Sequence, residues 1–221
     1  MYIKIKLVID FIIALIAMPF AGLVILISAV CIKLDDGGPV FYMADRTGRF
    51  GKPFKMLKLR TMRVNAPDIR LDDDSTYNSE NDPRVTAFGR IARKISIDEL
   101  PQLINVLKGD MAIIGPRPDS VSYIGKYTDE ERQILNVRPG ITGYNQAINR
   151  NASGTKEKLR NDIYYVRHMS FLFDIKILIM TVKTVFSHKN IYRQAEQPAE
   201  PLYQEAEMSG SGEKEVPAKI R

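Results

Sequence analysis

The strongest constraint on what this chain can fold into is an apolar run near its N-terminal end. Residues Leu7 to Ile32 form 26 consecutive positions with one charged side chain, Asp10. A straight helix of that length would extend about 39 Å, whereas the hydrocarbon core of a bilayer is about 30 Å thick. The run therefore predicts a helix that enters or crosses a membrane.

Pro19 lies at the middle of this run, directly after Met18. Proline removes one helical hydrogen bond and clashes with the preceding turn, so it predicts a kink. Each half would then be about 18–20 Å long and would reach only partway through the bilayer. Prolines are also tolerated in spanning helices. On composition alone, a re-entrant helix-break-helix over residues 1–34 and a kinked spanning helix therefore both stay open.

Charge on the two flanks of the run favours the re-entrant form. Lys4 and Lys6 precede the run, and the strongly basic stretch 46–63 follows it. Cytoplasmic segments carry the excess of Lys and Arg, so both flanks are expected on that side. A cleaved secretory signal is less favoured, because the run is too long for an ordinary signal core and Val30 is a poor residue before a cleaved Cys31.

Charge and side-chain chemistry limit what the rest of the chain can bind. The net charge is +6, but residues 194–221 hold six acidic and three basic side chains, so residues 1–193 carry +9 (6 minus −3). A basic body indicates an anionic partner: phosphate esters, nucleic acid or acidic lipid headgroups. One cysteine and two histidines allow no internal disulfide and nearly exclude a His/Cys zinc site, so oxygen ligands are expected for any metal. The polar composition of the tail 194–221 predicts disorder.

The pattern between the apolar run and the tail predicts one domain, residues 35–193, of α/β class, rich in helix and with a small irregular sheet. Strands are expected at 40–42 and 54–59, and helices at 85–94, 96–107, 130–136, 156–168 and 171–186. Residues 65–83 are polar and without hydrophobic period, which predicts a mobile loop beside a site. The apolar but charge-bearing helix 171–186 fits either an amphipathic helix in the membrane interface or a core helix.

The densest concentration of polar chemistry is the stretch 93–102, with the sequence RKISIDELPQ. Ser96 followed by Glu99 is the pattern of a capping box, in which both side chains bond the first turn of a helix. Pro101 disturbs this interpretation, because in that register it falls one residue beyond the first turn and would strain the helix. An irregular helix start is therefore expected, and both a capping and a catalytic role for Asp98 and Glu99 stay open.

A catalytic role for Asp98 and Glu99 would be phosphoryl chemistry. A carboxylate can attack phosphorus and hold the group as an acyl phosphate, and a neighbouring carboxylate can help to hold Mg²⁺. The charge of a transferring phosphoryl group needs fixed cations, which suits the bidentate hydrogen bonds of arginine. Arg117 lies between two prolines, and Arg150 follows a stiff, glycine-bearing loop at 138–143. These cations should also favour the ionised form of Asp98.

Taken together, these segments resemble the bacterial sugar transferases, the monotopic phosphoglycosyl transferases, over about residues 1–190. The resemblance rests on eight motifs in matching order and spacing: GPVF at 38–41, FKMLKLRTM at 54–62, DPRVT at 82–86, SIDELPQL at 96–103, NVLKGDM at 105–111, GPRP at 115–118, RPGITG at 138–143 and DIYYV at 162–166. The chain departs from the family pattern at two positions. Met18 replaces the serine before the helix-breaking proline, and Asn149 stands where glycine is common.

The resemblance implies a membrane enzyme of bacteria. Residues 1–34 would form the re-entrant helix, broken at Met18 and Pro19 with both ends cytoplasmic. The domain 35–193 would be a single catalytic domain on the cytoplasmic face of the inner membrane, anchored also by interfacial amphipathic helices and contacting membrane lipids. The family uses a UDP-sugar donor, a polyprenyl phosphate acceptor such as undecaprenyl phosphate, and Mg²⁺, for which Mn²⁺ can substitute. A homodimer is compatible with this architecture.

The resemblance also assigns roles to individual residues. Asp98 takes the position of the family's nucleophile and Glu99 that of its dyad partner, and both would bind the metal. Residues at or beside phosphate-binding positions are Arg93, Arg117, Arg150, Lys58 and Arg60. The reaction would pass through a covalent phospho-sugar on Asp98, release UMP and leave a polyprenyl-diphosphate-sugar. That would be the first membrane step in assembling an exopolysaccharide, a lipopolysaccharide or a capsule.

Two alternatives stay open. One is direct transfer, with Asp98 or Glu99 as a general base and no covalent intermediate. The other is a non-catalytic membrane anchor with a basic face, which explains the charge and the apolar run but not a carboxylate pair among fixed arginines. Nucleic acid is not an expected partner, because the chain lacks the interleaved aromatic residues of a single-strand binder.

Overall fold

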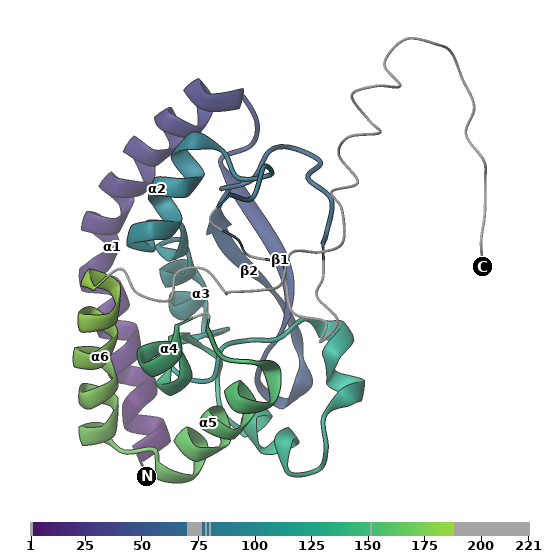
Figure 1. Cartoon of the computed structure of the whole chain (residues 1–221). Coiled ribbons are helices and arrows are strands. Elements are labelled where there is room, and N and C mark those ends of the chain that lie inside the picture. The colour runs from purple at the N-terminus through teal and green to yellow at the C-terminus, as the bar shows by residue number, and fades with distance from the viewer. Residues whose placement is uncertain (1, 70–76, 78, 80, 151, 188–221) are drawn as a thin grey trace.

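The computed structural model describes residues 2–69, 77, 79, 81–150 and 152–187 (Figure 1). Its elements follow in the order α1 (Tyr2–Asp36), β1 (Phe41–Thr47), η1 (Arg49–Gly51), β2 (Pro53–Leu59), α2 (Ala87–Ile95), η2 (Ile97–Glu99), α3 (Gln102–Lys108), β3 (Ala112–Ile114), η3 (Val121–Lys126), η4 (Glu131–Asn136), β4 (Gly140–Thr142), α4 (Tyr144–Asn149), α5 (Thr155–His168) and α6 (Phe171–Phe186), where η denotes a 3-10 helix. The chain is therefore rich in helix with little sheet, as predicted.

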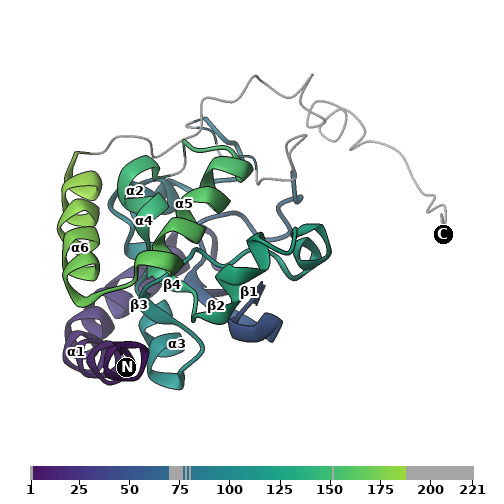
Figure 2. The ribbon, with the colours of Figure 1, turned by 90° about the horizontal axis from the view of Figure 1, so that it is seen from below.

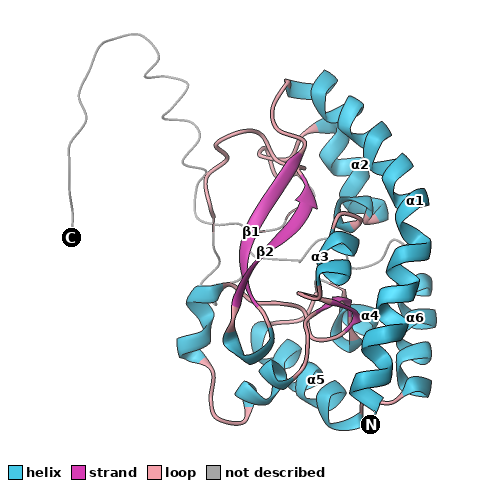
Figure 3. Cartoon of the chain, turned by 180° about the vertical axis from the view of Figure 1, so that it is seen from behind, coloured by secondary structure: helices cyan, strands magenta, loops and turns pink. Residues whose placement is uncertain are grey.

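Helix α1 is 35 residues long and continues through Met18 and Pro19. Its axis curves along its length, which is visible from both sides of the molecule (Figures 1 and 3). Among the described residues, α1 is the one helix long and apolar enough to cross a membrane. A helix long and apolar enough to enter or cross a membrane is thus confirmed at this place. Its insertion in a membrane, its re-entrant course and a break at Pro19 stay predictions.

One face of α1 packs on the protein and the other is exposed. Ala14 and Ala21 pack in one cluster with Leu103, Val106 and Met111, where their small side chains let the helices approach closely. The other face exposes large apolar side chains: Val8, Ile12, Leu15, Ile16, Phe20, Leu23, Leu26, Ile27 and Leu34. An exposed apolar face of this length marks a surface for membrane contact.

A buried polar cluster fixes the first turns of α1 to α6. Lys6 Nζ lies 3.1 Å from Asp10 Oδ2 and 2.9 Å from Asp174 Oδ2. The Tyr2 hydroxyl donates to Asp174 Oδ2 at 2.5 Å, and the Tyr165 hydroxyl donates to Asp174 Oδ1 at 2.8 Å. Charged groups in an apolar setting persist when they are paired and hydrogen-bonded. Asp10, the lone charge of the apolar run, is therefore part of a joint between α1 and α6.

The strands form two separate pairs instead of one sheet. Strands β1 and β2 form an antiparallel hairpin that pairs Phe41 with Leu59 at one end and Thr47 with Pro53 at the other. The short strands β3 and β4 run parallel. The two predicted strands are confirmed, and the structure pairs them. Strand β1 extends five residues beyond its expected end, because its later residues pair with the first half of β2.

Helices α4, α5 and α6 pack together, with α4 in contact with both α5 and α6. Seen from below, α1 and α6 lie along one edge of the molecule and the β1–β2 hairpin lies on the far side (Figure 2). Helix α6 buries Asp174 and Ile177 and exposes a row of apolar side chains: Phe171, Leu172, Ile175, Leu178, Ile179, Val182 and Phe186. This exposure favours the interfacial helix over the core helix, the two forms left open by the sequence.

Two predicted segments fall wholly or partly outside the described residues. The tail 194–221 lies outside them entirely. Of the predicted mobile loop 65–83, residues 70–76, 78 and 80 lie outside, and the described part is held by Arg84, which donates to the carbonyls of Pro67 and Tyr77. The domain boundaries at 34/35 and 193/194 stay predictions.

Candidate active site

Asp98 and Glu99 lie in the short 3-10 helix η2, which joins α2 to α3. Ser96 has a left-handed backbone, with φ of 62°, and ends α2, so η2 starts in a new direction. Pro101 directly precedes α3, where its missing N–H is not needed. The irregular start predicted from Pro101 is confirmed. The capping box is wrong, because no side chain caps η2 and the Glu99 side chain turns elsewhere.

Glu99 is held between two cations. Lys58 Nζ donates to Glu99 Oε1 at 2.8 Å, and Arg117 Nη2 donates to the same oxygen at 2.9 Å. Burial alone would raise the pKa of Glu99, but these two ion pairs hold it well below its usual range. The second oxygen, Oε2, accepts no hydrogen bond from the described part of the chain. Glu99 is therefore a fixed carboxylate anion with one oxygen available.

Asp98 is buried, with 8% of its surface exposed. Burial raises the pKa of its carboxyl group and the charge of Glu99 adds to this, while Lys58, Arg93 and Arg117 act in the opposite direction. The cations act on the pKa in the direction expected from sequence, but desolvation outweighs them, so the net shift of the Asp98 pKa is upward. No described residue hydrogen-bonds to the Asp98 carboxyl group. A carboxylate surrounded by cations, yet engaged by none through a hydrogen bond, is free to act as a nucleophile.

Arg117 reaches Glu99 from a loop that is pinned at its base. Gly115 N donates to Thr142 O at 2.9 Å, and Gly140 N donates to Pro116 O at 2.9 Å. A side chain at Gly115 would come within 2.5 Å of the Arg138 carbonyl oxygen, so the position has no room for one. The Pro-Arg-Pro segment therefore presents the Arg117 guanidinium on a rigid support, as predicted from its prolines.

Arg93 and Arg150 lie together at the C-terminal end of α2, which directly precedes the dyad in the chain. Arg93 Nε donates to Thr61 Oγ1 at 2.9 Å. Arg150 Nη2 donates to the carbonyls of Arg93 and Lys94 and to Ser96 Oγ, at 3.0–3.2 Å. Arg150 thus caps the C-terminal end of α2, where its charge also complements the helix dipole. The sequence pointed to a phosphate ligand and missed this structural contact.

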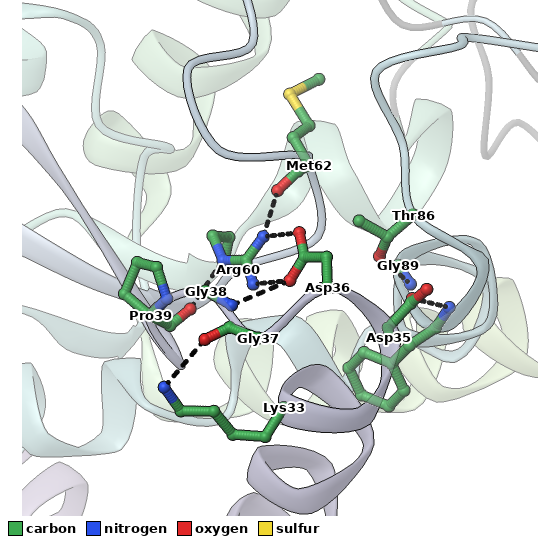
Figure 4. A network of polar contacts seen from close by, with 11 residues as sticks. Lys33, Asp35, Asp36, Gly37, Gly38, Pro39, Arg60, Met62, Thr86 and Gly89 are labelled. Carbon is green, nitrogen blue, oxygen red and sulfur yellow. Dashed lines mark hydrogen bonds and ion pairs between the residues drawn. The ribbon is translucent and has the colours of Figure 1, made fainter.

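Arg60 makes contacts that the sequence did not predict. Its guanidinium forms a two-pronged ion pair with Asp36 at the end of α1 and donates to the carbonyls of Pro39 (2.6 Å) and Met62 (2.9 Å) (Figure 4). Four of its five N–H groups are used in this way, and 6% of its surface is exposed. These contacts clamp α1 to the end of β2 and use most of the guanidinium donors, and the phosphate-binding role expected from sequence stays a prediction.

Sequence reasoning missed a second charged group behind Arg117. It consists of Asp119, two residues after Arg117, together with Lys158 and Asp162 of α5. Lys158 and Asp162 are spaced i, i+4 on a predicted helix, which was a usable signal for an ion pair. Their convergence on Asp119, which lies 39 residues before Lys158, could not be read from the sequence.

The dyad fits a hard cation such as Mg²⁺. In the described part of the chain, no group of three or more His, Cys, Asp or Glu side chains converges on one point. Mg²⁺ commonly binds through one or two carboxylates, with waters and substrate phosphates completing its shell. The unengaged oxygens of Asp98 and Glu99 meet that requirement, whereas a site made by protein ligands alone does not form.

Comparison with known proteins places this geometry in context. The sequence model of the family described as "Bacterial sugar transferase" matches residues 1–188. An uncharacterized sugar transferase of Bacillus subtilis is 42% identical over 180 residues, covering 81% of this chain and 86% of the relative. An exopolysaccharide production protein of Rhizobium meliloti is 37% identical, covering 78% and 81%. The UDP-glucose:undecaprenyl-phosphate glucose-1-phosphate transferase of Escherichia coli is 39% identical over 83% of this chain, which spans 40% of that longer protein.

Proposed function

The chain belongs to the bacterial sugar transferase family, and on that basis we propose that it transfers a sugar-1-phosphate from a UDP-sugar to a polyprenyl phosphate. The acceptor would be undecaprenyl phosphate, which the name of the Escherichia coli relative specifies. The products would be UMP and a polyprenyl-diphosphate-sugar. The name of the Rhizobium meliloti relative supports a role in building an exopolysaccharide.

One observation carries this proposal. Asp98 is a buried carboxyl group without a hydrogen-bond partner among the described residues, and its neighbour Glu99 is fixed by Lys58 and Arg117. A carboxylate kept for structure would be capped or paired. A basic membrane anchor has no need of such a group, which argues against the non-catalytic alternative.

We propose that the reaction proceeds in two displacements at phosphorus. In the first, an Asp98 carboxylate oxygen attacks the sugar-bearing phosphorus of the donor. The bond from that phosphorus to the bridging oxygen breaks, and UMP leaves with the electron pair. In the second, an oxygen of the lipid phosphate attacks the same phosphorus. The acyl-phosphate bond breaks and the Asp98 carboxylate is restored.

The cations around the dyad suit this chemistry. Lys58 and Arg117 each use one N–H on Glu99, which leaves two donors on the ammonium and four on the guanidinium for phosphate oxygens. Hydrogen bonds from a fixed guanidinium to phosphate are charge-assisted and bidentate. Asp98 and Glu99 would hold Mg²⁺, which supplies charge neutralisation on the diphosphate when bound. Glu99, locked by its two cations, keeps its free oxygen in place for this task.

We propose that the domain works on the cytoplasmic face of the inner membrane. The exposed apolar faces of α1 and α6 supply the anchor, and the basic flanks of α1 favour the cytoplasmic side under the positive-inside tendency. The arrangement would bring a soluble donor and a membrane acceptor to one carboxylate.

Release of UMP tests this function. The purified protein would be incubated with polyprenyl phosphate, Mg²⁺ and each member of a panel of UDP-sugars. We expect UMP release with at least one donor, and none with the Asp98→Asn variant. A folded, membrane-bound protein that releases no UMP with any donor, and that binds acidic vesicles equally well with and without the Asp98 carboxylate, would support the non-catalytic anchor.

A further inference from the structure

The loop that carries Arg117 is tied to helix α5 by a buried lysine. Lys158 Nζ lies 2.8 Å from both carboxylate oxygens of Asp119, two residues beyond Arg117. The Tyr127 hydroxyl donates to Asp119 Oδ2 at 2.6 Å. Only 15% of the Lys158 side chain is exposed. A lysine buried this far persists because it is paired, and here the pair joins the end of the Pro-Arg-Pro segment to α5.

Asp119 is also the point where the loop meets the β1–β2 hairpin. Thr47 N donates to Asp119 O at 2.9 Å, and Thr47 Oγ1 donates to Ser120 O at 3.3 Å. At the other end of the loop, Gly140 N holds Pro116 O. Arg117 therefore lies between two fixed points, and the side chain of Asp119 is the contact that connects the loop to α5.

A second acid lies behind this contact. Asp162 is fully buried, and its Oδ2 lies 3.4 Å from Lys158 Nζ. Neither of its oxygens accepts a hydrogen bond from the described residues. Two acids therefore share one lysine, and Arg117 is the next cation whose charge acts on Asp162. The chain thus maintains a costly buried arrangement directly behind an arginine of the site.

We propose that Lys158 is a positioning residue, which through Asp119 holds the loop that presents Arg117 to Glu99. Lys158 touches neither Asp98 nor Glu99, so its effect on the reaction would pass through the placement of Arg117. The inference rests on the proposed function for its effect on rate, but the loop contact can be tested without it.

A double-mutant cycle on the rate of UMP release tests the coupling, with Lys158→Met and Arg117→Ala made singly and together. We expect Lys158→Met alone to lower kcat by about 10²-fold, the scale of a catalytic group displaced by about 1 Å. Once the Arg117 side chain is gone, the same change should lower kcat by less than about threefold. Lys158→Arg keeps a bidentate partner for Asp119 and should recover most of the loss.

Lys156→Met is the matched control, because Lys156 is exposed on the same helix and contacts none of these groups. It should leave the rate unchanged. Lys158→Met leaves Asp119 and the buried Asp162 without their cation and can fail to fold. Asp119→Asn, which keeps the shape of the side chain and weakens the same contact, therefore serves as the second variant in an identical cycle.

Amide hydrogen exchange of the detergent-solubilised protein measures directly how firmly the loop is held. The amides of Thr47 and Gly140, which bond the loop on its two sides, should lose protection in Lys158→Met and Asp119→Asn but not in Lys156→Met. This readout needs no transfer activity, so a wild type that releases no UMP would count against the proposed function alone. Equal losses of rate with and without the Arg117 side chain, or unchanged protection of both amides, would overturn the positioning role.

Discussion

The buried carboxyl group of Asp162 should make the stability of this fold depend on pH. Asp162 is fully buried, and burial raises its pKa to about 7, with the charge of Asp119 adding to the rise and Lys158 and Arg117 opposing it. The Tyr127 hydroxyl also lies in this cluster and bonds Asp119. In the unfolded chain, Asp162 titrates at the usual pKa of an aspartate. Between the two pKa values the folded protein binds a proton that the unfolded chain has lost.

The direction and the size of this change in the free energy of unfolding with pH follow from proton linkage. Because the folded state holds the extra proton, the stability that Asp162 contributes is complete below the unfolded pKa and is lost as pH rises toward the folded one. Each pH unit in that window costs about 1.4 kcal/mol. From about pH 5 to about pH 7, the free energy of unfolding should therefore fall by about 3 kcal/mol on account of Asp162 alone.

Asp162→Asn removes the titration and keeps the shape of the side chain. We expect the variant to match the wild type below about pH 4, and its advantage in the free energy of unfolding to grow by about 3 kcal/mol from about pH 5 to about pH 7. The measurement is the midpoint of unfolding in the same detergent. Asp129→Asn is the control, since Asp129 is exposed. If the two midpoints stay parallel over the whole range, or if the wild type gains stability relative to the variant as pH rises, the buried-acid reasoning is wrong.

Three further predictions concern the site and the anchor. Arg60→Met should lower the free energy of unfolding by roughly 1–2 kcal/mol, because it removes the hydrogen bonds to Asp36 and to the carbonyls of Pro39 and Met62, yet the folded protein should keep its kcat; a folded variant with lost kcat would place Arg60 in the site. Activity should vanish in excess EDTA and return with Mg²⁺ or Mn²⁺, since the dyad offers hard oxygen ligands to a diphosphate substrate; full activity in EDTA would exclude a required metal. In a Cys31→Ser chain, Lys4→Cys should react with a membrane-impermeant thiol reagent only after cells are permeabilised, whereas labelling of intact cells would establish a spanning helix.

Sequence patterns predicted best those helices whose ends are set by nearby residues, such as a capping side chain. Helix 171–186 has the ends expected from the sequence, because Ser170 caps it and its apolar spacing continues to Phe186. Helix α5 begins one residue before its expected start. The segment 130–136 forms a 3-10 helix instead of an α-helix. Both strands of the hairpin were predicted in place, but their pairing was not predicted and the first strand is longer than expected, since the length of a strand depends on its partner.

The sequence predicted which charged residues belong to the site better than it predicted the contacts that they make. The structure does bring Lys58 and Arg117 to the Asp98–Glu99 dyad. Each of these charged residues stands in a short motif that could be recognised in the sequence. The ion pair of Arg60 was not foreseen, because its partner, Asp36, lies 24 residues away at the end of another element. Burial raises the pKa of Asp98 and the nearby cations lower it. The sequence could not show which effect is larger, because the extent of burial does not follow from sequence patterns.

The mass of the peptide that contains Asp98 tests directly whether the reaction passes through a covalent phospho-sugar. The wild type would be incubated with its UDP-sugar donor and Mg²⁺, without lipid acceptor, and then digested for mass spectrometry. We expect one added sugar-phosphate group on Asp98 and up to one UMP released per chain, neither of which should occur in Asp98→Asn. An active wild type that never carries this group, and whose kinetics require both substrates bound together, would contradict the covalent mechanism and establish direct transfer.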